Sequence, residues 1–125
     1  MDSHSSTEAQ KSIVVLPFVN MSTDPENEFF SDGITEEIIN ALTLINGLKV
    51  IARTSSFAYK GKQVDVRQIG NELGVSNILE GSVRKAGNRI RVTAQLINST
   101  DGTHLWAKNF DRELSDIFVL QDEIS

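Results

Sequence analysis

The first part of the chain alternates apolar and polar stretches in the order strand, helix, strand. Ser12 to Phe18 is a short apolar run, interrupted by Pro17, of the kind that forms a strand buried on both faces. Apolar residues recur at helical spacing between Phe29 and Ile45, and Asp32 is predicted to cap the start of this helix. Leu48 to Ala52 is a second apolar run. The pattern predicts a βαβ unit with two parallel strands.

A short helix is predicted next, after a polar connection. Asp65 has the character of an N-cap, and Gln68 stands three residues later as its capping-box partner. Gly74 is expected to end the helix in the left-handed conformation that glycine adopts without strain. The sequence between Asp65 and Gly74 therefore predicts a helix of two to three turns.

Strict alternation of apolar and polar residues marks the next segment. It runs through Asn77 to Arg84 and again through Arg89 to Leu96, with a turn at Ala86-Gly87-Asn88 between them. This pattern predicts a hairpin with one buried face and one wet face. Thr103 to Phe110 is predicted to add a third antiparallel strand, and Ser115 begins a last helical pattern.

Together these elements predict an α/β fold. Its sheet is expected to be mixed and five-stranded, built from the βαβ unit and three antiparallel strands, with helices flanking it. Residues 1–11 are polar and are predicted to be a disordered lead-in. Residues 12–125 are expected to form one domain, truncated within or after its last helix because no stop signal follows it.

Composition and charge exclude several classes of function. The net charge is −5, and the longest run among the 12 basic residues is only Arg84-Lys85. A nucleic acid or an anionic membrane surface is therefore not expected as the main partner, since both require clustered Lys and Arg. The chain has no cysteine, which excludes disulfides and cysteine nucleophiles. No apolar run reaches the roughly 18 residues of a membrane span, so membrane insertion is not expected.

Four segments of the chain resemble a known bacterial module, in the same order. They are VLPFVNMSTDPENEFFSDGITEEI, RTSSFAYKGK, LGVSNILEGSVRKAG and QLINSTDGTHLWAKNFDREL. The module is similar to the amino-terminal domain of TolB and is related to the FlgO-type domain. The resemblance extends from about Lys11 to the C-terminus.

The resemblance implies a regulatory or protein-interaction role. Members of this family occur in long chains, many of which resemble class III adenylate or guanylate cyclases, with the catalytic domain upstream and tetratricopeptide repeats downstream. Others carry a winged-helix DNA-binding domain upstream. The resemblance implies a small mixed sheet with helices, and it implies no catalytic residues and no cofactor in the module itself.

A candidate anion site follows the second predicted strand. Arg53, Thr54, Ser55 and Ser56 stand at the carboxyl end of that strand, where ligands of open α/β sheets bind. A guanidinium group, hydroxyls and backbone amides are suited to hold an anion. The alternative is structural, in which a hydroxyl caps a helix and Arg53 pairs with a carboxylate such as Glu80.

Other chemistries fail on spacing or residue type. Gly61-Lys62 does not belong to a P-loop, because position 56 is Ser and position 63 is Gln. The acidic group Asp24, Glu26, Glu28 and Asp32 lacks EF-hand spacing and precedes a helix, where the dipole favours negative charge. No metal site is therefore expected. The chain has no G-x-S-x-G elbow, and intrinsic enzyme activity is not expected.

Protein–protein interaction is the remaining class of function. The interface candidates are Trp106, Phe110, Ile117, Leu120 and Ile124. Trp106 lies on a predicted edge strand, which invites a partner strand, although it could instead pack under the last helix. The apolar stripe of the helix from Ser115 could drive homodimerisation.

The sequence thus predicts a non-catalytic regulatory or protein-interaction module of a multidomain bacterial signalling protein of the adenylate or guanylate cyclase type. Its expected partners are neighbouring domains of the parent chain, another protein or a second copy, in the cytoplasm. Two alternatives stay open: a sensor of a small anionic ligand, and a periplasmic TolB-like interaction domain.

Overall fold

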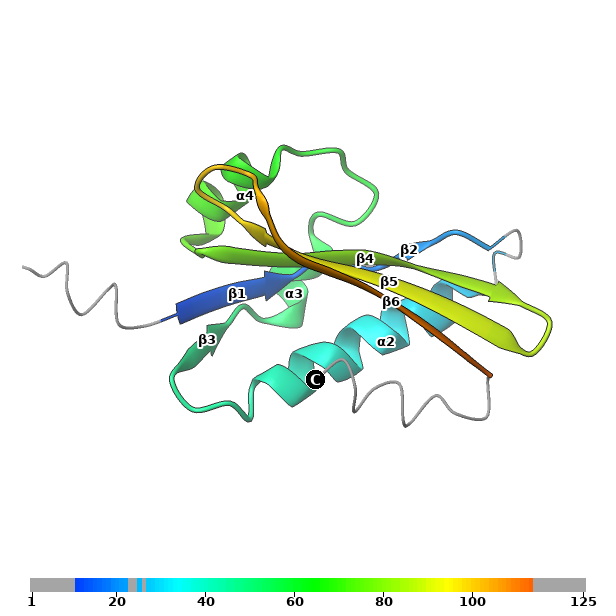
Figure 1. Ribbon diagram of the computed structural model, residues 1–125. Helices are drawn as coiled ribbons and strands as arrows, with labels where there is room; N and C mark the ends of the chain where they lie inside the picture. Colours follow the sequence, from blue (N-terminus) through cyan, green and yellow to red (C-terminus); the bar gives the residue numbers. More distant parts are fainter. Residues whose placement is uncertain (1–10, 23–24, 26, 114–125) are drawn as a thin grey trace, which may run out of the picture.

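The structure is a computed structural model that describes residues 11–22, 25 and 27–113, with the backbone alone at 112 and 113. Its elements along the chain are β1 (Lys11–Val15), β2 (Val19–Asn20), α2 (Asn27–Leu42), β3 (Leu48–Val50), α3 (Arg53–Phe57), α4 (Val66–Leu73), β4 (Asn77–Ala86), β5 (Arg89–Asn98) and β6 (His104–Glu113) (Figure 1).

One mixed sheet organises the molecule. Its strand order is β3-β1-β4-β5-β6, and β2 also pairs with β4. β1 runs parallel to both β3 and β4, whereas β4, β5 and β6 are antiparallel neighbours. Helix α2 lies along one face of the sheet and α4 lies against the other (Figure 1). The predicted α/β fold, with its βαβ unit and three antiparallel strands, is confirmed.

The sheet has six strands rather than the predicted five. The predicted first strand, Ser12 to Phe18, ends at Val15 before Pro17, and Val19–Asn20, just past its predicted end, forms the additional strand β2. Proline has no N–H to donate to a ladder, so the strand ends at Val15 and the chain bends. The next amide, that of Phe18, donates a hydrogen bond to Thr35 Oγ1 on α2 at 2.9 Å. β2 then pairs with β4 farther along the same strand, so β1 and β2 flank a gap in one ladder.

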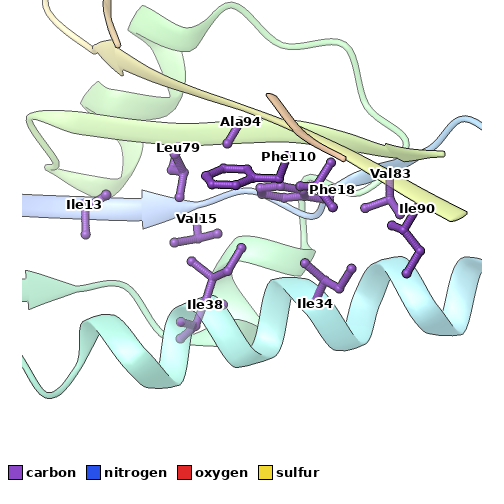
Figure 2. Packing of buried hydrophobic residues seen from close by; sticks show 12 residues of the cluster. Ile13, Val15, Phe18, Ile34, Ile38, Leu79, Val83, Ile90, Ala94 and Phe110 are labelled. Atoms are coloured by element: carbon purple, nitrogen blue, oxygen red, sulfur yellow. The ribbon is translucent and has the colours of Figure 1, made fainter. Parts of the chain in front are cut away.

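The main core lies between α2 and the sheet. Figure 2 shows Ile34 and Ile38 pointing from α2 toward Phe18, Val83 and Phe110. The full set of buried members is Ile13, Val15, Phe18, Ile34, Ile38, Ile39, Leu79, Val83, Ile90, Val92, Ala94 and Phe110. The residues that the alternation in β4 and β5 predicted to be buried, such as Val83 and Val92, are the ones that face this core.

A second core lies on the opposite face, and it corrects the prediction of a wholly wet face on the hairpin. Ile78 and Ile97 stand directly opposite each other on β4 and β5, and both are buried. They pack with Ile69 of α4 in a cluster that also contains Val14 and Val75. The wet face therefore begins only beyond this end of the hairpin.

The helix boundaries show which local signals act as predicted. Asp65 caps α4, since its carboxylate accepts a hydrogen bond from the Arg67 amide at 2.8 Å, and Gly74 ends the helix in the left-handed conformation. The capping box does not form, because the Gln68 side chain donates to Glu72 at 3.0 Å instead. Asp32 is not an N-cap either, since α2 begins at Asn27.

The remaining predictions fall at the ends of the chain. The third antiparallel strand reaches Glu113, three residues past the predicted end at Phe110. Lys11 begins β1, whereas the rest of the predicted lead-in and the last helix from Ser115 lie outside the described residues. Within the described ranges, no helix is long and apolar enough to cross a membrane.

Candidate functional site

The predicted anion-binding residues all fall on α3, directly after β3. Arg53 is half exposed, and its Nε lies 3.2 Å from Glu36 Oε2 on α2. Its guanidinium carbon also lies 4.0 Å from the centroid of the Phe57 ring. The carboxylate that pairs with Arg53 is therefore Glu36, and not Glu80 as the structural alternative suggested.

The three hydroxyls beside Arg53 have different surroundings. Ser56 is fully buried, and its Oγ donates to the main-chain carbonyl of Val15, which fastens α3 to β1. Thr54 and Ser55 are exposed. No side-chain hydrogen bond caps the start of α3 among the described residues, so the predicted hydroxyl cap is not formed. An anion held by Arg53, Thr54 and Ser55 stays a prediction, without Ser56.

A cleft of about 280 Å³ opens beyond the carboxyl end of β1, where the ladder with β4 is interrupted. It is lined by Leu16, Pro17 and Val19, by the turn from Tyr59 to Gln63, and by Glu80 and Gly81. This is the position at which open α/β sheets bind ligands. Gly61, with φ of 76°, allows the sharp turn that brings Lys60 and Lys62 to the cleft.

The two lysines of the cleft differ in their partners. Lys60 Nζ lies 2.7 Å from Asp32 and 3.2 Å from Glu28, and the hydrogen bond with Asp32 is the main reason that the pKa of Lys60 is raised. Lys62 is exposed and has no ion pair among residues 11–22, 25 and 27–113. The cleft therefore offers a ligand one cation that has no ion pair in the described chain, Lys62, and one half-buried carboxylate, Glu80. The charge of Lys62 also contributes to the lowered pKa of Glu72.

Tyr59, which lines the cleft, is held by a hydrogen bond to α4. The Tyr59 hydroxyl donates to Glu72 on α4, and this bond raises the pKa of Tyr59. The pKa of Glu72 is lowered by the hydrogen bonds from Gln68 and Tyr59. This cleft was not predicted from the sequence, because Gly61-Lys62 matches no P-loop spacing. The two lysines that flank Gly61, after a predicted strand and a polar connection, are the sequence signal from which it could have been found.

β6 is the second candidate surface. It pairs only with β5 within the described sheet, and each of its described side chains except that of Phe110 is exposed. Trp106 stands opposite Leu96 and is 40% exposed. A bulge displaces Leu105 from the ladder, and this side chain is 53% exposed. Two large apolar groups are therefore presented along one strand.

The other predicted interface residues are not available on this surface. Phe110 is 1% exposed and belongs to the main core, with Lys108 Nζ at 5.1 Å from its ring centroid. Its prediction as an interface residue was wrong, because β6 directs its ring toward α2. Ile117, Leu120 and Ile124 lie outside the described residues.

No metal-binding cluster is found in the part of the chain that the structure describes. Of the four acids that were predicted to precede the helix, Glu28 and Asp32 lie within α2 and share Lys60, and Asp24 and Glu26 lie outside the described residues. His104 is an exposed residue at the start of β6.

Comparisons with known proteins place the chain in a family. Residues 9–125 match the sequence profile of the family described as "HilA/YgeH-like transcriptional regulator, second domain". A protein of Rhizobium meliloti (strain 1021) named "Putative adenylate cyclase 3" is 61% identical over 117 residues. The match covers 94% of this chain and 20% of that protein, so the chain spans a fifth of its relative's length.

Two solved structures show the same fold. The C-terminal domain of LpoB from Escherichia coli has a TM-score of 0.66 at 17% identity, covering 84% of each chain. TolB from Acinetobacter baumannii has a TM-score of 0.66 at 15% identity, covering 93% of this chain and 26% of that one. The resemblance to TolB is thus supported as a likeness of fold, while the sequence profile that matches is that of the HilA/YgeH-like second domain.

Proposed function

The chain belongs to the family of the second domain of HilA/YgeH-like transcriptional regulators, and from this premise we propose that it is a non-catalytic regulatory module. The module binds a neighbouring domain or a partner protein more tightly in one state than in another, and so biases the activity of an effector domain. The proposal assigns no catalytic step and no cofactor to these residues.

The observation that carries the proposal is the β6 strand, which pairs only with β5 among the residues that the structure describes. An edge strand presents unpaired main-chain N–H and C=O groups, to which a strand of another chain can add. Exposed aromatic side chains are enriched at the centres of interfaces, and Trp106 lies on this strand beside Leu105. Native proteins usually protect so long an edge, and none of the residues described in the structure pairs with the outer side of β6, which favours a partner at this position.

The contrast between the two sequence relatives supports a regulatory role. One family is named for transcriptional regulation, and the Rhizobium relative is named as an adenylate cyclase. A domain shared by proteins with such different effectors does not itself supply either chemistry. We propose a cyclase-type parent, because 61% identity is high, and tetratricopeptide repeats downstream remain part of that proposal.

A cytoplasmic location follows from this proposal. The nucleotide substrates of a cyclase and the DNA target of a transcriptional regulator are both cytoplasmic. The periplasm remains the alternative, and the likeness of fold to TolB is what supports it.

The test uses the intact parent protein, identified by sequencing the gene on both sides of this segment. We expect Leu105→Glu with Trp106→Glu to change the rate of cyclic nucleotide formation several-fold, since both charges oppose burial at an interface. The matched control is Leu44→Glu, at a residue that is 84% exposed in the loop after α2. Unchanged output in the double variant, or cyclic nucleotide formation by the 125-residue chain alone, would contradict the proposal.

A second candidate function, sensing of a small anionic ligand, is supported by the cleft beyond β1. Lys62 lies at this cleft without an ion-pair partner in the described chain, and Arg53 lies on the preceding helix. A ligand bound only by the folded state raises the melting temperature as its concentration rises. Succinate and inorganic phosphate are suitable probes, because each fits a cleft of about 280 Å³.

Three variants locate the ligand in this second case. Lys62→Met is expected to abolish the thermal shift if the anion binds in the cleft, and Arg53→Ala if it binds on α3. Lys49→Met, at an exposed lysine on β3, is the control. Absence of any concentration-dependent shift with both probes argues against sensing of these anions.

A further inference from the structure

Arg84 of β4 and Arg91 of β5 stand directly opposite each other in the antiparallel ladder. They lie on the face of the sheet away from α2, since their neighbours Val83 and Val92 belong to the main core. Like charges at directly opposed positions destabilise a sheet. The Arg84–Arg91 pair therefore does not stabilise the fold. Residue pairs that oppose folding are expected at surfaces that bind a partner.

The row of charges continues onto β6, where Asp111 stands opposite Arg91. Its carboxylate accepts hydrogen bonds from Arg91 at 3.0 Å and from Arg89 at 3.1 Å. These two bonds lower the pKa of Asp111. One carboxylate is thus shared by two guanidinium groups, whereas Arg84 has no ion-pair partner within the described residues.

A shallow hollow of about 730 Å³ lies beside Arg84 at the tip of the hairpin. Its wall includes Lys85 and the exposed side chain of Met21, which follows β2. The Lys85 amide donates to Ser22 Oγ at 2.7 Å, so the hairpin and the segment after β2 are fastened together. Lys85 stands opposite Ile90 of the main core and so lies on the α2 face. This leaves Arg84 and Met21 as the groups that the hollow shares with the face of Arg91.

We propose that this basic hairpin surface, formed by Arg84, Arg91 and Met21, docks an acidic segment of a partner protein. Opposed side chains in a ladder have Cβ atoms about 4.5–5.5 Å apart, so one incoming carboxylate reaches both Arg84 and Arg91. Guanidinium groups bind carboxylates through paired, charge-assisted hydrogen bonds. Met21 offers a soft contact to an apolar residue within the acidic segment.

Charge favours a protein segment over a nucleic acid as the occupant. The chain carries a net charge of −5, so a long polyanion such as duplex DNA is repelled by most of the molecule. A short acidic segment contacts only the hairpin end and avoids that repulsion. The inference rests on the proposed function, because it names the chemistry of one partner of the interaction module.

The experiment uses the 125-residue chain and a labelled synthetic peptide of Asp and Glu residues with one central Leu, followed by fluorescence anisotropy. We expect Arg84→Ser and Arg91→Ser each to weaken binding on the order of tenfold. Added salt should weaken the wild-type complex. The matched controls are Arg67→Ser and Lys49→Ser, at exposed cations on α4 and β3, and they should bind as wild type.

Thermal melting of the same variants separates loss of binding from loss of folding. Arg84→Ser should keep or raise the melting temperature, since it removes the like-charge pair. The proposal is overturned if the variants at Arg84 and Arg91 bind as tightly as the controls, or if duplex DNA binds more tightly than the peptide. The edge-strand test in the parent protein involves none of these arginines, so each proposal can fail without the other.

Discussion

The ring of Phe18 occupies the space into which a side chain at Gly81 would point. A Cβ at position 81 would lie 2.8 Å from Phe18 Cε2 and 2.0 Å from the carbonyl oxygen of Thr93. Phe18 is buried in the main core, directly after the break at Pro17. Because Gly81 has no side chain, the ring of Phe18 can pack against β4 between β1 and β2.

Gly81→Ala is expected to destabilise the protein by about 3 kcal/mol, because the new methyl group overlaps a main-chain oxygen as well as a buried ring. Gly33→Ala is the matched control. It lies within α2 with nothing within 4 Å of its added Cβ, and it should stabilise by about 0.5–1 kcal/mol. Urea unfolding measures both, and equal midpoints for the two variants would contradict this account.

Thr35 on α2 satisfies the buried amide that the strand break leaves without a ladder partner. Its Oγ1 accepts from the Phe18 amide at 2.9 Å and donates to the Ser31 carbonyl at 3.0 Å. Thr35→Val keeps the shape but leaves a buried donor unsatisfied, at a cost of about 1–3 kcal/mol. Thr35→Ser retains the hydroxyl and should lose clearly less stability. If the two variants unfold at the same urea concentration, the hydrogen bond has no such role.

The capping carboxylate of Asp65 should contribute to stability in a pH-dependent way. Its hydrogen bonds with Arg67 lower its pKa from 3.8 to about 2. A carboxyl with a lowered folded-state pKa stabilises the fold above pH 3.8, and this contribution is lost as the pH falls toward 2. Asp65→Asn keeps an N-cap side chain and should flatten the fall in melting temperature between these two pH values. Glu37→Gln, at an exposed site on α2, is the control, and the same flattening there would exclude a specific role for Asp65.

The apolar stripe Ile117, Leu120 and Ile124 is predicted from the sequence to form a homodimer interface. We expect the weight-average mass of the 125-residue chain to rise with concentration in sedimentation equilibrium. Leu120→Glu should abolish that rise without lowering the melting temperature by more than a few degrees. A monomer at all concentrations would remove this interface from consideration.

Local sequence signals determined the order and type of the elements. The N-cap at Asp65, the left-handed Gly74 and the alternation on either side of Gly87 each depend on a few neighbouring residues, and each was predicted correctly. Asp32 shows where such reasoning fails, because a good capping residue was available and the helix nevertheless began earlier, at Asn27.

The tertiary structure decided every relationship between distant elements. The pairing of Arg53 with Glu36 and the opposition of Arg84 and Arg91 join residues on different elements. Two helices on opposite faces also decided that Ile78 and Ile97 are buried together on the face that alternation alone predicted to be wet. Capping and periodicity act over one or two turns of chain. Strand register, ion-pair partners and clefts arise only when separate elements pack, since their energies depend on contacts that no single segment makes.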